Sequence, residues 1–147
     1  MYASIVVGTD GSHTAQCAVE EATRLAKALG GELHLVSAFE PQRGARIAGA
    51  PEAAAKIWAP APDAAAQAVV DEAAASARVG GVEVKPHMLT GDPADALIEV
   101  AEQEKADLIV VGSRGMHGVG RVLGSVPNKV SHRARCNVLI VATDDAG

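Results

Sequence analysis

The chain has 147 residues, of which 48% are hydrophobic and 21% charged, and its formal net charge is −5 at pH 7. This composition excludes a disordered or fibrous protein and fits one globular domain over residues 1–147. Only 2% of the residues are aromatic and the pI is near 5.5, so we expect no nucleic-acid partner. With no long apolar run and no basic, apolar leader, we expect a cytoplasmic protein without membrane contact.

The first half of the chain alternates between strand and helix patterns. A β-branched run predicts a strand at Ser4–Gly8, and apolar residues at a 3.6-residue period predict a helix at His13–Leu29. Glu32–Phe39 is expected to be the second strand. Residues 40–62 hold four prolines and no sustained period, which predicts a long crossover loop.

The second half continues the alternation. A proline among polar residues makes the third strand typical of a sheet edge, and an aspartate before a proline predicts the start of the next helix. The expected elements are a helix at Asp63–Val79, a strand at Val82–Leu89, a helix from Pro93 capped by Asp92, a strand at Asp107–Val111, a helix at Ser125–Arg133 and a strand at Asn137–Ala142. Amphipathic helices between apolar strands predict an α/β fold with a parallel sheet and helices on both faces.

A glycine-rich segment follows the apolar run Leu108–Val111. It reads Gly-Ser-Arg-Gly from Gly112 to Gly115, and Gly124-Ser125 then precedes a helix pattern. Glycines let the backbone approach an anion, and the first turn of a helix offers unpaired N–H groups to the same ligand. Together these features predict a phosphate site; a flexible surface loop is the plainer alternative.

The basic residues support the same interpretation. Arg114, Arg121, Lys129, Arg133 and Arg135 lie between Gly112 and Cys136, and no Asp or Glu interrupts them. Because the whole chain is acidic, this concentration of positive charge beside the glycines is expected to attract a small anion.

The order of motifs resembles the universal stress protein family over essentially the full chain. The resemblance is carried by Val6-Val7-Gly8-Thr9-Asp10-Gly11-Ser12, Leu35–Phe39, Lys105–Gly115, Leu123–Val126 and Asn137–Val141. It implies a Rossmann-like five-stranded parallel sheet of order 3-2-1-4-5. It also implies a homodimer, expected here through the last strand at about Asn137 to Ala142, and in one branch of the family an adenine-nucleotide site.

The resemblance implies a set of ligand-contacting residues. Thr9 and Asp10 would meet the base and ribose beside Gly8, although Asp10 could instead cap the first helix. Ala38 would offer backbone hydrogen bonds to the adenine and Val111 would pack on it. The residues implied around the ribose and phosphates are Gly112, Ser113, Arg114, Gly115, Gly124, Ser125 and Val126.

The glycine motif departs from the family pattern at one point. Gly112 and Gly115 match the first pair and Gly124-Ser125 matches the last, but eight residues, Met116–Leu123, separate them where the pattern has nine. A shorter loop suits the single charge of cyclic AMP better than a triphosphate. The resemblance therefore implies ATP, with Mg²⁺ where required, or cyclic AMP, and leaves both open.

Efficient catalysis and a dedicated metal site are not expected. No lysine precedes Ser125 as in hydrolysing P-loops, and the glycine segment has no carboxylate to orient water. The two cysteines and five histidines also lack zinc-like spacing along the sequence. We therefore expect a nucleotide-binding regulatory module, with a slow ATPase and a ligand-free interaction protein as alternatives.

Overall fold

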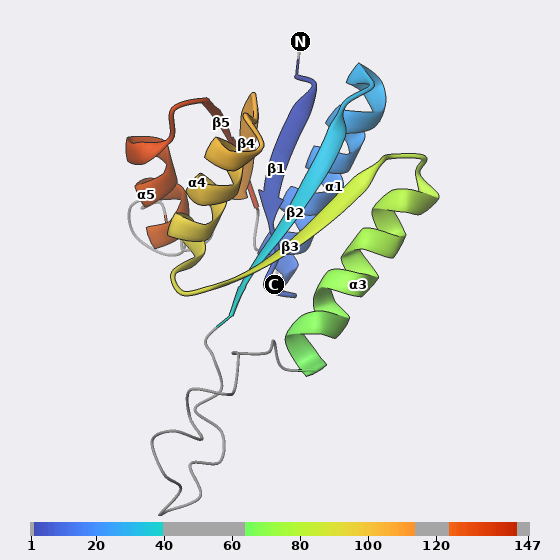
Figure 1. The fold of residues 1–147 in the computed structure, drawn as a ribbon, viewed down its shortest axis with the longest axis horizontal. Coiled ribbons are helices and arrows are strands. Elements are labelled where there is room, and N and C mark those ends of the chain that lie inside the picture. The colour runs from blue at the N-terminus through green and yellow to red at the C-terminus, as the bar shows by residue number, and fades with distance from the viewer. Residues whose placement is uncertain (1, 40–63, 114–123, 144–147) are drawn as a thin grey trace, which may run out of the picture.

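The computed structural model describes residues 2–39, 64–113 and 124–143. At its centre is a five-stranded, all-parallel sheet (Figure 1). The strands are β1 (Ser4–Gly8), β2 (Glu32–Phe39), β3 (Val84–Thr90), β4 (Leu108–Gly112) and β5 (Asn137–Val141), and the helices are α1 (His13–Leu29), α3 (Ala64–Val79), α4 (Pro93–Gln103) and α5 (Ser125–Arg133). The order β3-β2-β1-β4-β5 confirms the fold that the family resemblance implied.

Two hydrophobic layers enclose the sheet. Alternation along β1 sends Ile5 and Val7 to the layer under α1 and α3, and Val6 to the layer under α4 and α5. Figure 1 shows these two pairs of helices on opposite sides of the sheet. Among the described residues the buried hydrophobic side chains are those of Ala, Val, Leu and Ile, together with Pro127.

The bounds of three strands differ from prediction: β5 ends at Val141, one residue early, β4 ends at Gly112, one residue late, and the starts of β3 and β4 also shift. β3 begins at Val84, because its register with β2 starts at the Leu33–Val84 pair, and it extends to Thr90. β4 begins at Leu108, one residue late, because the Asp107 carboxylate accepts backbone hydrogen bonds from Ala3 and Ser4 at 2.7 and 3.0 Å.

The helix α4 begins as predicted. The Asp92 side chain accepts a hydrogen bond from the backbone N–H of Asp95 at 3.0 Å, and Pro93 occupies the first turn. The crossover segment expected at 40–62 and the glycine segment at 114–123 lie outside the described residues. In the described ranges, none of the helices has the length and apolar character needed to cross a membrane.

Candidate functional site

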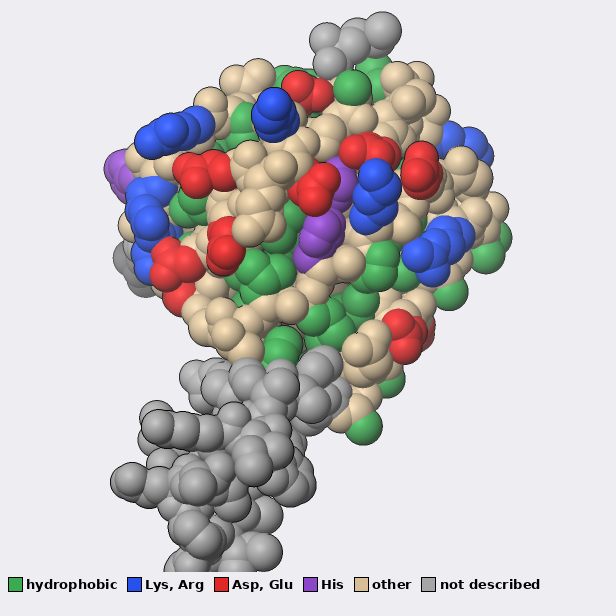
Figure 2. All heavy atoms as spheres, in the orientation of Figure 1, with side chains coloured by type: hydrophobic (Ala, Val, Ile, Leu, Met, Phe, Trp, Pro, Cys, Tyr) green, Lys and Arg blue, Asp and Glu red, His purple; other side chains and the backbone are tan. Residues whose placement is uncertain are grey.

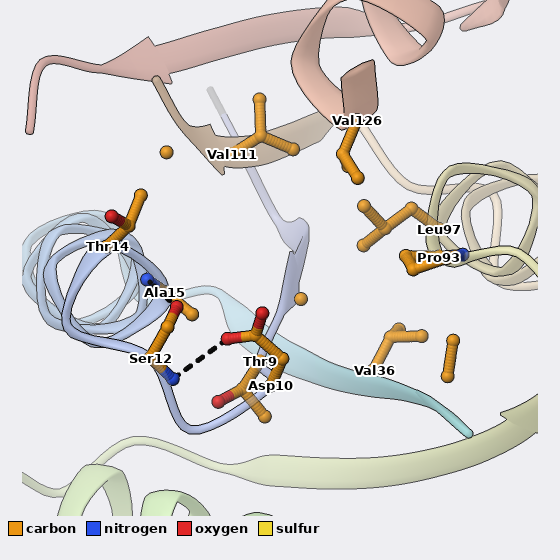
Figure 3. A pocket seen from close by; sticks show the side chains of 13 residues that line it. Thr9, Asp10, Ser12, Thr14, Ala15, Val36, Pro93, Leu97, Val111 and Val126 are labelled. Atoms are coloured by element: carbon orange, nitrogen blue, oxygen red, sulfur yellow. Dashed lines mark hydrogen bonds between the residues drawn. The ribbon is translucent and has the colours of Figure 1, made fainter. Parts of the chain in front are cut away.

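A cleft opens at the carboxyl ends of β1, β2 and β4. Its cavity measures about 130 Å³. The described residues that line it are Gly8, Thr9, Asp10, Ser12, Thr14, Ala15, Val36, Ala38, Pro93, Leu97, Val111, Gly112 and Val126 (Figure 3). The connections after β1 and β4 lead to helices on opposite faces of the sheet, so the cleft lies where parallel α/β sheets bind ligands.

The turn between β1 and α1 is fixed by local hydrogen bonds. The backbone N–H of Thr9 donates to the carbonyl of Val36 at 2.9 Å, which holds the end of β1 against β2. Asp10 Oδ1 accepts from the backbone N–H of Ser12 at 2.8 Å, and Ser12 Oγ accepts from Ala15 N–H at 3.1 Å. Ser12, rather than Asp10, is therefore the N-cap of α1, and the alternative role considered for Asp10 was wrong.

Two glycines in the cleft are closely packed, Gly112 more tightly than Gly8. A Cβ on Gly112 would lie 2.6 Å from Thr14 Cγ2 and 3.0 Å from the Thr14 carbonyl oxygen. A Cβ on Gly8 would lie 3.2 Å from Leu97 Cδ2. Neither glycine has a positive φ. Their function in this cleft is to leave space between the strand ends and the helices.

The cleft has a polar and an apolar side. Figure 3 shows Thr9, Asp10, Ser12 and Thr14 at the β1–α1 turn and the start of α1. On the other side, the apolar groups come from the strand ends and from the starts of α4 and α5. They are Val36, Pro93, Leu97, Val111 and Val126. Such a cleft can pack a flat apolar ring on one side and hydrogen-bond hydroxyl groups on the other.

The structure brings together just over half of the predicted site residues. Seven of the twelve line the cavity: Gly8, Thr9, Asp10, Ala38, Val111, Gly112 and Val126. Ser113, Gly124 and Ser125 are described but do not line it. Arg114 and Gly115 lie outside the described residues.

Ser113 makes its contacts near the end of β5. Its side chain is 3% exposed, and its Oγ lies 3.1 Å from Thr143 Oγ1 and accepts the Thr143 backbone N–H at 2.9 Å. Its backbone N–H donates to the carbonyl of Val141 at 3.0 Å. These hydrogen bonds of Ser113 connect the segment after β5 to the segment after β4.

Gly124 and Ser125 begin α5. Gly124 is the N-cap residue, with φ −60° and ψ 166°, and makes no side-chain capping bond. Ser125 is the first helical residue, as predicted. The first turn of α5 reaches the cavity through Val126, the next residue along the helix.

The positive charge expected beside the cleft is partly neutralised by α4. Lys129 Nζ lies 3.2 Å from Asp92 Oδ2 and 3.3 Å from Asp95 Oδ1, and Arg133 also pairs with Asp95. Arg135 Nε lies 3.8 Å from Glu102 Oε1. The charge segregation seen along the sequence thus joins α5 to α4 in space, while Arg114 and Arg121 lie outside the described ranges.

These ion pairs shift ionisation equilibria. The Arg133 guanidinium first, and then the Lys129 ammonium, lower the pKa of Asp95 below its ordinary value. Hydrogen bonds to Asp92 and then Asp95 raise the pKa of Lys129. Both shifts favour the charged forms that connect the two helices.

Six cavity residues were not predicted: Ser12, Thr14, Ala15, Val36, Pro93 and Leu97. Ala15 lies in the helix predicted at His13–Leu29 and Leu97 in the helix predicted from Pro93, and neither was expected at the site. Periodicity shows which face of a helix is apolar, but not that its first turns pass the end of a strand. The parallel sheet offered a signal that these residues lie near the site. In such a sheet α1 and α4 both begin at the carboxyl edge, where the cleft lies.

Comparisons with known proteins agree with this architecture. The model of the universal stress protein family matches residues 1–142. The universal stress protein Rv1636 of Mycobacterium tuberculosis is 42% identical over 145 residues, covering 97% of each chain. The chain therefore belongs to the universal stress protein family.

Two solved structures resemble the fold. A universal stress protein in complex with cAMP is 35% identical, with a TM-score of 0.73 over 95% of this chain and 96% of that one. The hypothetical protein MJ0577 is 24% identical, with a TM-score of 0.77 over 99% of both chains, and shows likeness of fold alone.

Proposed function

We propose that this protein binds an adenine nucleotide in the cleft at the carboxyl edge of the sheet and acts as a regulatory module of the stress response. The observation that carries the proposal is the cavity shared by the ends of β1 and β4, with an apolar side and a hydroxyl-rich side. A relative 35% identical to this chain has been solved in complex with cAMP, which supports the same ligand class.

In the proposed complex the purine lies between Val111 and the α4 side of the cleft. Ala38 supplies backbone hydrogen bonds to the edge of the base. Thr9 and Asp10 face the ribose, since hydroxyl and carboxylate oxygens accept from sugar hydroxyls. The phosphate is bound by the glycine segment that begins at Gly112 and by the start of α5, where Gly124 and Ser125 lie.

We propose cyclic AMP as the preferred nucleotide and ATP, with Mg²⁺, as the alternative. The support is the glycine segment between Gly115 and Gly124, which is one residue shorter than the family pattern. A cyclic monophosphate carries one negative charge, so it needs fewer N–H donors than a triphosphate. Lys129, Arg133 and Arg135 form ion pairs with carboxylates at α4, so fewer basic side chains remain to bind a triphosphate.

The proposed module binds without efficient turnover. The glycine segment lacks the lysine that hydrolysing P-loops place before Ser or Thr. Slow ATP hydrolysis remains the second candidate function, and the discriminating measurement is phosphate release over hours against a Gly112→Ala variant. A ligand-free interaction protein is the third, and saturable binding of any adenine nucleotide contradicts it.

Isothermal titration of the purified chain with ATP, AMP and cyclic AMP, with and without Mg²⁺, tests the proposal. We expect saturable binding of cyclic AMP. Micromolar affinity for ATP with no heat from cyclic AMP would contradict the preference, and no binding of any of the three would contradict the function.

A pair of matched variants tests whether the nucleotide binds in this cleft. Ala38→Leu adds a side chain to the cavity lining, whereas Ala68→Leu adds the same group at an exposed position of α3. We expect the first variant to weaken nucleotide binding at least about tenfold, which corresponds to ~1.4 kcal/mol. The second should bind like the parent chain. Equal affinity in both variants would place the nucleotide elsewhere.

A further inference from the structure

Two histidines far apart in the sequence meet on the α4 side of the sheet. His34 lies in β2 and His87 in β3, where His87 is the register partner of Val36. Since Val36 and His34 are two residues apart on one strand, both imidazoles lie on the same face. His34 Nδ1 is 2.9 Å from His87 Nε2, and the ring centroids are 5.1 Å apart.

A carboxylate fixes the orientation of His34. The His34 ring is fully buried, and its Nε2 lies 3.0 Å from Glu32 Oε1. The other oxygen, Glu32 Oε2, lies 3.2 Å from Lys85 Nζ, so the carboxylate is itself held in place. With the Nε2 proton donated to Glu32, the lone pair on His34 Nδ1 points toward His87.

A third ligand comes from the end of α4. Glu104 follows the last helical residue, and one of its carboxylate oxygens lies within 4.8 Å of a ring nitrogen of His34 and of a ring nitrogen of His87. We propose that His34 Nδ1, His87 Nε2 and the Glu104 carboxylate bind a divalent transition-metal ion of the zinc type. Water would complete a tetrahedral set, as in zinc sites with three protein ligands.

The distances require little rearrangement. Two nitrogens bound to one tetrahedral zinc at ~2.0 Å are roughly 3.3 Å apart, and the facing nitrogens here are 2.9 Å apart. Without metal, a proton lies between these two nitrogens, and the ion takes the place of that proton. His87 needs to move slightly outward and the Glu104 carboxylate to move closer, while His34 is held in place by Glu32 and by burial.

The ligand chemistry selects the class of ion. Imidazole nitrogen suits zinc, nickel, cobalt and copper, whereas magnesium and calcium prefer oxygen-only sites. The surroundings favour a cation, because Glu32 and Glu104 carry two negative charges against the single positive charge of Lys85. Figure 2 shows histidine surface in the middle of the face viewed in Figure 1, with acidic and basic side chains around it.

The spacing of the histidines along the sequence did not indicate this metal site. His34 and His87 are 53 residues apart, while zinc motifs are recognised by ligands a few residues apart. The expectation of no metal site depended on that spacing. The signal that carries the proposal is the pairing of β2 with β3, which only the sheet order provides.

Titration of the full chain, without a histidine tag, with ZnCl₂ in competition with a chromophoric chelator tests the proposal. We expect one zinc ion per chain, undisturbed by excess MgCl₂. Loading the chain with Co²⁺ should give the intense visible absorption of a four-coordinate ion. Failure to bind zinc stoichiometrically, or a weak six-coordinate cobalt spectrum, overturns the proposal.

Variants then assign the ligands. His87→Gln and Glu104→Gln should each weaken zinc binding by at least about tenfold, whereas His132→Gln, at an exposed position of α5, should leave it unchanged. Circular dichroism verifies that the variants are folded. A folded His87→Gln chain that binds zinc like the parent overturns the assignment. Nucleotide titration of the same variants keeps this result separate from the proposed function, because the three ligands do not line the cleft.

Discussion

Gly112 and Thr14 approach each other so closely that a methyl group does not fit between them. The Cβ of an alanine at position 112 would lie 2.6 Å from Thr14 Cγ2. We expect Gly112→Ala to lower the free energy of unfolding by about 1–3 kcal/mol, the usual cost of overpacking. We also expect it to weaken nucleotide binding, because α1 would be displaced at the cleft. Urea unfolding and calorimetric titration measure the two effects.

A second substitution checks the cause of that loss. Thr14→Ser removes Cγ2 but keeps the hydroxyl group and the backbone carbonyl, whose oxygen would lie 3.0 Å from the new Cβ. The double variant, Gly112→Ala with Thr14→Ser, should therefore recover part of the unfolding free energy that Gly112→Ala alone loses. If the two effects simply add, the contact between Gly112 and Thr14 is not the source of the strain.

Two valines on α3 should respond very differently to truncation. Val70 is fully buried, whereas Val79 is 89% exposed. We expect Val70→Ala to cost about 2 kcal/mol of unfolding free energy through lost burial and a residual cavity. Val79→Ala should change it by less than about 0.5 kcal/mol. Chemical denaturation compares the pair, and equal losses would contradict the packing of α3 on the sheet.

The N-cap of α1 gives a third prediction. Ser12 Oγ accepts a hydrogen bond from Ala15 N–H, so Ser12→Ala should cost about 1 kcal/mol. Ser131→Ala on α5 is the control, because that exposed hydroxyl donates to the Asn128 carbonyl within its own helix. We expect the control to stay within about 0.5 kcal/mol of the parent chain. Thermal unfolding of both variants provides the comparison.

The ion pairs between α4 and α5 should make stability depend on acid. The pKa of Asp95 in the folded chain lies below its ordinary 3.8, so its contribution is fully present above that value. It is lost as the pH falls through the lower, folded-state pKa. Asp95→Asn should therefore be less stable than the parent at neutral pH, and the difference should vanish in acid.

High salt offers an independent check on the same carboxylate, since these side chains are about half exposed. The difference between Asp95→Asn and the parent should shrink as ionic strength rises. Glu99→Gln removes a negative charge from the same helix, at a carboxylate that accepts from Gln103 at 3.3 Å. A pH profile of that control identical to the profile of Asp95→Asn would contradict the role of Arg133 and Lys129.

The β5 edge of the sheet should pair with a second copy of the chain. In the described part of the chain β5 has one strand neighbour, β4, and Leu139 is 36% exposed. We expect light scattering to give a homodimer, and Leu139→Lys to shift it toward monomer. Val79→Lys adds the same charge far from this edge and should not. A monomeric parent chain at high concentration would contradict the prediction.

Local patterns predicted the elements well because local physics decides them. The period of α1, the Asp92 cap and Pro93 at the start of α4 each depend on neighbours a few residues away. The strand order came from family resemblance rather than from any residue, because register is set by contacts far apart in the chain. The same limitation moved the start of β3 from Val82 to Val84.

About half of the residues of the candidate site could be predicted from the sequence. Gly8 ends a predicted strand and Thr9 and Asp10 follow it directly, so their place at the sheet edge could be predicted. Leu97 and Thr14 could not, because their contact with the strand ends arises from how the helices pack. Charge was misleading for a related reason: Lys129 and Arg133 are neutralised by Asp95, more than thirty positions away.

The place of β1 in the sheet has a consequence for synthesis. The partner β2 follows β1 closely in the sequence, but Leu108, the register partner of Ile5 in β4, is made only when most of the chain has been synthesised. Until then the middle of the future sheet is an open edge, able to capture another nascent chain. A chain that ends before β4 would therefore leave β1, the central strand of the sheet, as an exposed edge, rather than lose only an outer part of the fold.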